Sequence, residues 1–111
     1  MVLGQIFSPK GINLNLQSQD KDELFEEMVE SLVAVRPGLD RAELLEAVKV
    51  REEKMSTGIM HGIAVPHGKC SAVEGIVGAV GVSRQGIEYG SLDKAPVHLV
   101  FMFICGEKED E

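Results

Sequence analysis

Three histidines and two cysteines are the side chains of this sequence best suited to nucleophilic or metal chemistry: His61, His67, His98, Cys70 and Cys105. His61, His67 and Cys70 follow one another at intervals of six and three residues. A structural zinc site usually has four ligands in tighter pairs, so we expect no metal there. Nothing beside Cys70 marks an activated thiol, because a lysine is its only charged neighbour and no nucleophile elbow precedes it. His98 lies within a strongly apolar run, which favours a structural, hydrogen-bonded imidazole. His67 is therefore the candidate nucleophile.

The residues on either side of His67 predict how it is presented. Ile63 and Val65 alternate as in a short strand, and Pro66 must end its ladder or lie at a sheet edge, because proline has no N–H to donate. Gly68 permits close approach of another backbone directly after the histidine. The pattern places His67 at a strand exit, where α/β proteins usually carry their chemistry.

Arg51 is the cation that could act with His67. A helix is predicted from Asp40 to about Lys54, with an apolar stripe at Leu44, Leu45 and Val48 and with Met55 near its end. The spacing puts Arg51 on the buried side of this helix, near its C-terminus. Spacing alone favours an arginine that bonds the last carbonyls of the helix. A second interpretation is that its guanidinium reaches an anion held by the following loop.

The remaining elements alternate between helix and strand patterns. Ile12, Leu14 and Leu16 alternate with asparagines, which predicts a half-buried strand. A helix should follow, capped by Asp20 and ended by Pro37-Gly38, with this apolar stripe: Leu24, Phe25, Met28, Val29, Leu32 and Val33. Further strands are expected at Ile76–Val82 and Val97–Cys105. The sequence predicts one α/β domain over residues 1–111, with a mixed β-sheet and two N-terminal amphipathic helices packed on one of its faces.

Charge and composition exclude several classes of protein. Eighteen acidic against eleven basic residues give a net charge of -7 without a basic cluster, so nucleic acid is not an expected partner. The cysteines form no disulfide framework, and the N-terminus lacks the pattern of a signal peptide. The longest apolar stretch has nine residues and is too short to cross a bilayer. We expect a cytoplasmic protein without membrane insertion. No nucleotide-binding loop is present and no cofactor is implied.

The run from Arg51 to Gly68 resembles a known family. It contains Arg51, then Ser56-Thr57-Gly58, then Gly62-Ile-Ala-Val-Pro-His67-Gly68, with the histidine sixteen residues after the arginine. This run resembles the enzyme IIA domains of the fructose/mannitol class of the bacterial phosphoenolpyruvate-dependent phosphotransferase system, which include the nitrogen-regulatory IIA proteins. The order of strands and helices along the whole chain is also similar.

The resemblance implies a phosphohistidine relay. The histidine matching His67 would accept a phosphoryl group from the carrier HPr on Nε2 and pass it to a IIB domain for sugar uptake. Alternatively, a regulatory target protein would bind according to the phosphorylation state. Arg51 would neutralise the phosphoryl charge, and the backbone at Gly68 would help to cradle the group. The hydroxyls of Ser56 and Thr57 are further candidate donors, although either could equally cap or turn the chain.

Two features depart from the family pattern. The family usually has a glycine and a polar or acidic residue where this chain has Met60 and His61, so His61 is either an auxiliary phosphoryl ligand or a solvent-facing side chain. The sequence also stops at Glu107–Glu111, about where a second active-site histidine and C-terminal covering helices would follow. Without those helices one sheet face, at Val100, Met102 and Ile104 or their neighbours, would be exposed. We expect a homo-oligomer that buries this face.

Overall fold

The computed structural model describes residues 7–59 and 61–106. The expectations for residues 1–6, for Met60 and for the tail at 107–111 lie outside these residues. In chain order the elements are β1 (Phe7–Asn13), α2 (Lys21–Val35), α3 (Arg41–Lys54), β2 (Ile63–Ala64), β3 (His67–Lys69), β4 (Ile76–Ile87) and β5 (Val97–Cys105). Among them, no helix is long and apolar enough to cross a membrane.

The strands form one mixed sheet, as expected. The strand order is β1-β4-β5-β2, and β3 pairs with β5 beside β2. β4 and β5 form the antiparallel centre, whereas β1 runs parallel to β4, and β2 and β3 run parallel to β5. β2 ends at Ala64, and Val65 and Pro66, which has no N–H for a ladder, separate it from β3. His67 is consequently the first residue of a strand that pairs on one side only among the described strands.

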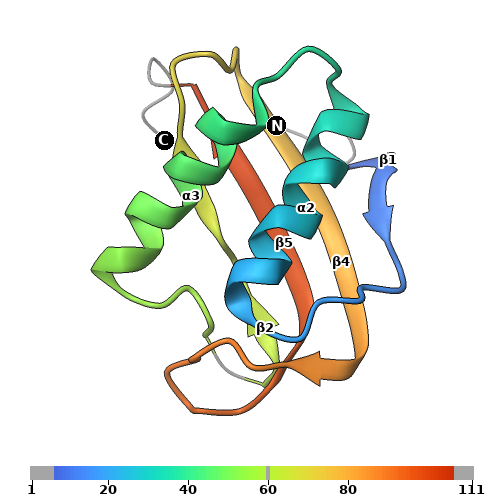
Figure 1. Ribbon diagram of the computed structural model, residues 1–111, viewed down its shortest axis with the longest axis vertical. Helices are drawn as coiled ribbons and strands as arrows, with labels where there is room; N and C mark the ends of the chain where they lie inside the picture. The colour runs from blue at the N-terminus through green and yellow to red at the C-terminus, as the bar shows by residue number, and fades with distance from the viewer. Residues whose placement is uncertain (1–6, 60, 107–111) are drawn as a thin grey trace.

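Both helices pack on the same face of this sheet (Figure 1). A Cβ added to Gly81 on β4 would meet Leu16 and Met28, and one added to Gly68 on β3 would meet Ala47 of α3. Gly81 pairs with Val100 and Gly68 with Ile104, two β5 residues of the same parity, so the two glycines point to one face. The core lies between this face and the helices.

Each helix begins at an aspartate. Asp20 accepts a hydrogen bond from the backbone N–H of Glu23 at 2.9 Å, and Asp40 accepts one from that of Ala42 at 2.8 Å. The apolar stripe predicted for the first helix is buried from Leu24 to Leu32. Local caps and helical periodicity therefore place both helices correctly.

Two predictions about apolar residues are wrong. Leu16 is buried, but Ile12 and Leu14 are 44% and 67% exposed, because β1 begins earlier and ends at Asn13. The side chain of Asn13 accepts a hydrogen bond from the N–H of Asn15, which turns the chain before Leu16 reaches the core. Met55, expected near the end of the second stripe, is 60% exposed.

The sheet face that the helices leave uncovered is formed by the neighbours of Val100, Met102 and Ile104, not by these three residues. Val100, Met102 and Ile104 are fully buried beneath the helices. Their neighbours Phe101 and Phe103 point to the opposite face and are half-buried. Association through this opposite face remains a prediction, which sedimentation or scattering at high protein concentration would test.

Candidate functional site

His67 is held at the sheet edge by its own backbone neighbourhood. Its Nδ1 lies 2.7 Å from the carbonyl oxygen of Val65, and its ring stacks on Phe103 with centroids 5.1 Å apart and planes 8° apart. A carbonyl oxygen can only accept, so in the neutral ring Nδ1 carries the proton and donates it. Nε2 is then the nitrogen with a free lone pair. The half-buried ring is thus fixed in both tautomer and plane.

Gly68 allows α3 to lie directly against β3. A Cβ at this position would lie 2.5 Å from the carbonyl oxygen of Ala47, closer than real Cβ atoms come. Any side chain here would push β3 away from the helix, because the obstacle is backbone rather than a flexible side chain. The glycine therefore fixes the spacing between α3 and the strand that carries His67.

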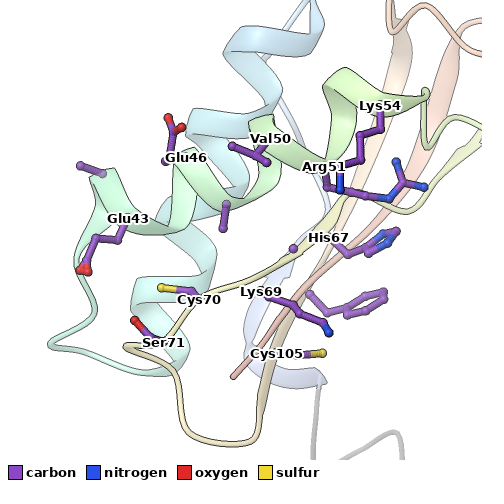
Figure 2. Close-up of a pocket in the computed structure, with 14 residues that line it drawn as sticks. Glu43, Glu46, Val50, Arg51, Lys54, His67, Lys69, Cys70, Ser71 and Cys105 are labelled. Atoms are coloured by element: carbon purple, nitrogen blue, oxygen red, sulfur yellow. The ribbon is translucent and has the colours of Figure 1, made fainter. Parts of the chain in front are cut away.

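A groove of about 940 Å³ runs between α3 and β3 (Figure 2). Its lining includes His67 and Gly68 from β3, Phe103 from β5, and Arg51 from the last turn of α3. The charged residues are divided along it: acidic Glu43 and Glu46 lie on the first half of α3, and the basic groups are Arg51, Lys54 and Lys69. The structure therefore brings together three of the predicted site residues, Arg51, His67 and Gly68.

Arg51 bonds the backbone at the helix end and also lines the groove. Its Nη1 donates a hydrogen bond of 2.9 Å to the carbonyl oxygen of Met55, just beyond the helix end. The same guanidinium lines the groove and extends toward the His67 ring (Figure 2). A guanidinium has five donors, and the bond to the Met55 carbonyl oxygen uses one of them.

The other predicted ligands do not line this groove. Ser56 Oγ accepts a hydrogen bond from the N–H of Gly58, and Thr57 is buried, with its hydroxyl bonded to Glu52. Both geometries match the interpretation in which these residues turn the chain after the helix. His61 is exposed, with a positive φ of 57°, and its N–H donates to Asp93.

His98 and the three residues considered as zinc ligands lie in different parts of the structure. His98 Nδ1 lies 2.8 Å from the carbonyl oxygen of Ser83, so its imidazole is hydrogen-bonded as predicted, although the residue is exposed. Within residues 7–59 and 61–106, no three His, Cys, Asp or Glu side chains lie close enough together to hold a metal ion. Cys70 lines the groove with His67, but His61 does not.

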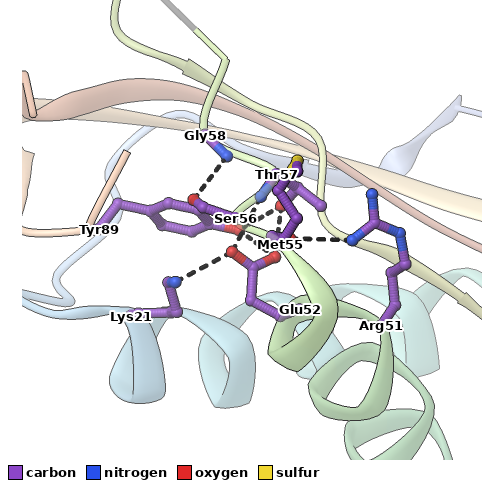
Figure 3. Close-up of polar contacts among 8 residues, drawn as sticks. All are labelled: Lys21, Arg51, Glu52, Met55, Ser56, Thr57, Gly58 and Tyr89. Atoms are coloured by element: carbon purple, nitrogen blue, oxygen red, sulfur yellow. Dashed lines mark hydrogen bonds and ion pairs between the residues drawn. The ribbon is translucent and has the colours of Figure 1, made fainter. Parts of the chain in front are cut away.

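A buried polar cluster around Glu52, the residue after Arg51, was missed by the sequence interpretation (Figure 3). Glu52 Oε1 accepts from the Thr57 hydroxyl at 2.6 Å, and Oε2 accepts from the Thr57 N–H and from Lys21 Nζ, both at 2.9 Å. The Tyr89 hydroxyl lies 2.7 Å from Thr57 Oγ1. Glu52 follows Val48 by four residues, a helical spacing that could have revealed its burial.

The cluster changes the acidity of two of its members. Burial raises the pKa of Glu52, but hydrogen bonds from Thr57 and Lys21 and the charge of Lys21 outweigh it and bring this pKa below its ordinary value of 4.5. Burial also raises the pKa of Tyr89 far above its ordinary value, a change that Thr57 opposes and the charge of Glu52 reinforces. The cluster therefore contains a carboxylate and a neutral phenol near pH 7.

Substitution of Glu52 by glutamine is expected to lower the free energy of unfolding at pH 7 by about 2 kcal/mol, because Lys21 loses a buried anionic partner. The folded pKa of Glu52 lies below the unfolded one. Its stabilising contribution is thus complete above about pH 4.5 and is lost as the pH falls through the folded pKa. Urea unfolding at several pH values measures the difference from wild type, which should shrink with acidification.

Glu30→Gln is the matched control for this substitution. Glu30 also forms an ion pair, with Arg41, but both side chains are 58% exposed. Its loss should cost much less at any pH, because exposed pairs are screened by solvent. Equal losses for the two variants would contradict the stabilising role assigned to the buried carboxylate.

Known proteins resemble this chain over almost its full length. Residues 5–111 match the profile of the family described as phosphoenolpyruvate-dependent sugar phosphotransferase system, EIIA 2. The chain is 39% identical over 107 residues to the fructose-specific EIIABC component of Bacillus subtilis (strain 168), covering 96% of this chain but only 17% of that protein. It is 29% identical over 109 residues to a nitrogen regulatory protein of Pseudomonas aeruginosa, covering 98% and 71% of the two chains.

Solved structures show the same fold. The nitrogen regulatory protein IIA-Ntr from Neisseria meningitidis superposes with a TM-score of 0.88 at 31% identity, covering 96% of this chain and 73% of that one. The mannitol IIA in its complex with phosphorylated IIB from Escherichia coli gives a TM-score of 0.76 at 23% identity, covering 94% and 74%. The second likeness shows the fold alone. The resemblance first indicated by the run from Arg51 to Gly68 is thus confirmed, and the chain belongs to the EIIA 2 family of the phosphoenolpyruvate-dependent sugar phosphotransferase system.

Proposed function

We propose that this protein is a phosphocarrier that accepts a phosphoryl group on Nε2 of His67 from phosphorylated HPr and passes it to a IIB domain. The observation that carries the proposal is the hydrogen bond from Nδ1 to the Val65 carbonyl oxygen, which leaves Nε2 as the nucleophilic nitrogen. We place the exchange in the cytoplasm, where phosphoenolpyruvate supplies the donor.

The transfer brings one phosphoryl group, with its negative charge, from the donor to His67, and no proton enters or leaves the ring. The N–P bond of the donor phosphohistidine breaks as the bond from Nε2 to phosphorus forms. The proton stays on Nδ1, which donates it to the Val65 carbonyl oxygen. In the second step the bond from Nε2 to phosphorus breaks as a cysteine thiolate of the IIB domain takes the group. Both steps need in-line positioning and neutralisation of charge on the phosphoryl oxygens rather than covalent help.

Arg51 is suited to the neutralising role. Its planar fork of donors matches two phosphoryl oxygens, and its bond to Met55 already holds it at the groove wall. The stacked Phe103 prevents the ring of His67 from tilting into the sheet face and so keeps Nε2 on one line of attack. The Gly68 backbone adjoins the ring and could contribute an amide to the cradle.

Labelling with phosphoenolpyruvate tests the proposal. Incubation with labelled phosphoenolpyruvate, enzyme I and HPr should transfer one phosphate per chain, labile in acid and absent when HPr is omitted. Addition of a IIB domain should then remove the label. Label that forms but is not removed by any IIB domain would contradict the hand-on step and favour the regulatory alternative, in which the phosphorylation state alone is sensed.

A further inference from the structure

We infer that Thr57 is a positioning residue of this site, which sets the orientation of both the His67 ring and the Arg51 guanidinium without touching the groove. The inference concerns the geometry of the site, and its kinetic consequence rests on the proposed function. It depends on three sets of contacts. Thr57 bonds Glu52, it bonds Val65 two residues before His67, and it closes the turn that contains Met55.

The first set fixes Thr57 to the helix. Its N–H and its hydroxyl donate to the two oxygens of Glu52, at 2.9 and 2.6 Å. The Glu52 carboxylate only accepts, so the Thr57 hydroxyl donates its proton to Glu52. The Tyr89 hydroxyl is then the donor in the 2.7 Å contact between Tyr89 and Thr57 Oγ1. Lys21 holds the same carboxylate at 2.9 Å and lies 4.6 Å from the centre of the Tyr89 ring. The single polar atom of the Thr57 side chain, Oγ1, thus donates to Glu52 and accepts from Tyr89.

The second set links Thr57 to His67 through the backbone of Val65. The Thr57 carbonyl oxygen accepts a hydrogen bond of 3.0 Å from the N–H of Val65. The Val65 carbonyl oxygen in turn accepts the Nδ1 proton of His67 at 2.7 Å. Only Pro66, whose φ is fixed by its ring, lies between these two residues. Displacement of Thr57 would therefore rotate the carbonyl that fixes the tautomer of His67.

The third set links Thr57 to Arg51 through the turn that contains Met55. Its partner, the Met55 carbonyl, lies in the short turn between Glu52 and Thr57. Closure of this turn by the two hydrogen bonds from Thr57 to Glu52 places the carbonyl where Nη1 can reach it (Figure 3). Loss of the closure would release the guanidinium from the groove wall. Thr57 thus positions both the His67 ring and the Arg51 guanidinium.

The chain offers a matched control in Ser91. This residue is also buried, at 7% exposed, and packs against Gly58, the residue after Thr57. Its hydroxyl has no hydrogen-bond partner among the described residues. Ser91→Ala therefore removes a buried hydroxyl from the same neighbourhood without removing a positioning contact.

Two measurements on Thr57→Val, Thr57→Ser and Ser91→Ala test the inference in the full chain. The first is ¹⁵N NMR of the histidine rings at alkaline pH, with no phosphate donor present. In the wild type and in Ser91→Ala, His67 should show a single tautomer protonated at Nδ1. Thr57→Val should give a mixture of tautomers, and Thr57→Ser, which keeps the hydroxyl, should restore the single form. His98, bonded to the Ser83 carbonyl, should be unchanged throughout.

The second measurement is the rate of phosphorylation by phosphorylated HPr. Thr57→Val should lower the rate at saturating donor by about tenfold to a hundredfold with little change in KM, since misplaced reacting groups slow the step rather than weaken docking. Thr57→Ser and Ser91→Ala should stay close to wild type.

The two measurements separate the inference from the proposed function. A wild type that takes up no phosphate would overturn the proposed function, while the NMR comparison would still decide the geometry. The inference is overturned if Thr57→Val keeps the single tautomer, if His98 changes as much as His67, or if Thr57→Ser fails to restore the ring. The last two results would mean a general loss of structure.

Discussion

A chain in which glutamine replaces His67 is expected to take up no phosphate from phosphorylated HPr. Glutamine fills a similar volume, but its carboxamide nitrogen has no lone pair that can attack phosphorus. The other residues that line the groove, Arg51 and Phe103 among them, are unchanged in this variant. The measurement is incorporation of labelled phosphate after incubation with phosphoenolpyruvate, enzyme I and HPr. Thermal unfolding of the same sample checks that the variant is folded.

His98→Gln is the control for this result. The two imidazoles are alike in one respect, since Nδ1 of each lies within 2.8 Å of a backbone carbonyl oxygen. They differ in place, because only His67 lines the groove beside Arg51. His98→Gln should therefore incorporate phosphate as the wild type does. Label retained in His67→Gln, or lost in His98→Gln, would place the acceptor elsewhere.

Substitution of Arg51 by alanine is expected to slow phosphorylation of His67 by about a hundredfold to a thousandfold, a magnitude typical of a donor aimed at developing charge. The phosphoryl oxygens carry their charge through the transition state, and the Arg51 guanidinium is held at the groove wall by its bond to the Met55 carbonyl oxygen. Arg51→Lys should recover only part of the rate, because an ammonium cannot bond two oxygens in one plane. Single-turnover kinetics with phosphorylated HPr measures these rates.

Arg36 provides a matched control for Arg51. It also follows a helix and bonds backbone carbonyls, those of Glu74 and Ile76, at 2.7 and 3.1 Å. It does not line the groove. Arg36→Ala should leave the phosphorylation rate near the wild-type value, whatever its effect on stability. An Arg51→Ala rate equal to that of Arg36→Ala would reduce Arg51 to a helix-capping residue.

Features that depend on nearby residues were predicted well. The caps at Asp20 and Asp40 and the stripe from Leu24 to Leu32 are encoded within one or two turns of helix, and the structure has them as expected. β5 also has its predicted bounds, because a continuous apolar run between turns is typical of a central strand. Such signals need no knowledge of distant parts of the chain.

Features that depend on distant partners were predicted poorly. Alternation alone suggested that Leu14 is half-buried, but the turn at Asn13 places it in solvent. The parity of β5 was left open, because only pairing with β4 and β3 decides which of its residues face the helices. β4 continues to Ile87 through an irregularity after Val82, although Gln85-Gly86 reads locally as a turn.

The site shows the same division. His67, Arg51 and Gly68 were identified from their types, their spacing and the family resemblance, and the structure places all three at one groove. Thr57 was considered a phosphoryl donor because of the family resemblance, or equally a residue that caps or turns the chain. Its actual partner, Glu52, is hidden in a charged helical segment. The contribution of Tyr89 comes from 37 residues beyond Glu52 and has no local signal.

The most direct test of the account is to identify the phosphorylated atom by ³¹P and ¹⁵N NMR of the labelled protein. We expect a single phosphorus bonded to Nε2 of His67, with the Nδ1 proton still present and shielded from exchange by the Val65 carbonyl. Phosphorus on Nδ1 of His67, or on any other side chain, would contradict it.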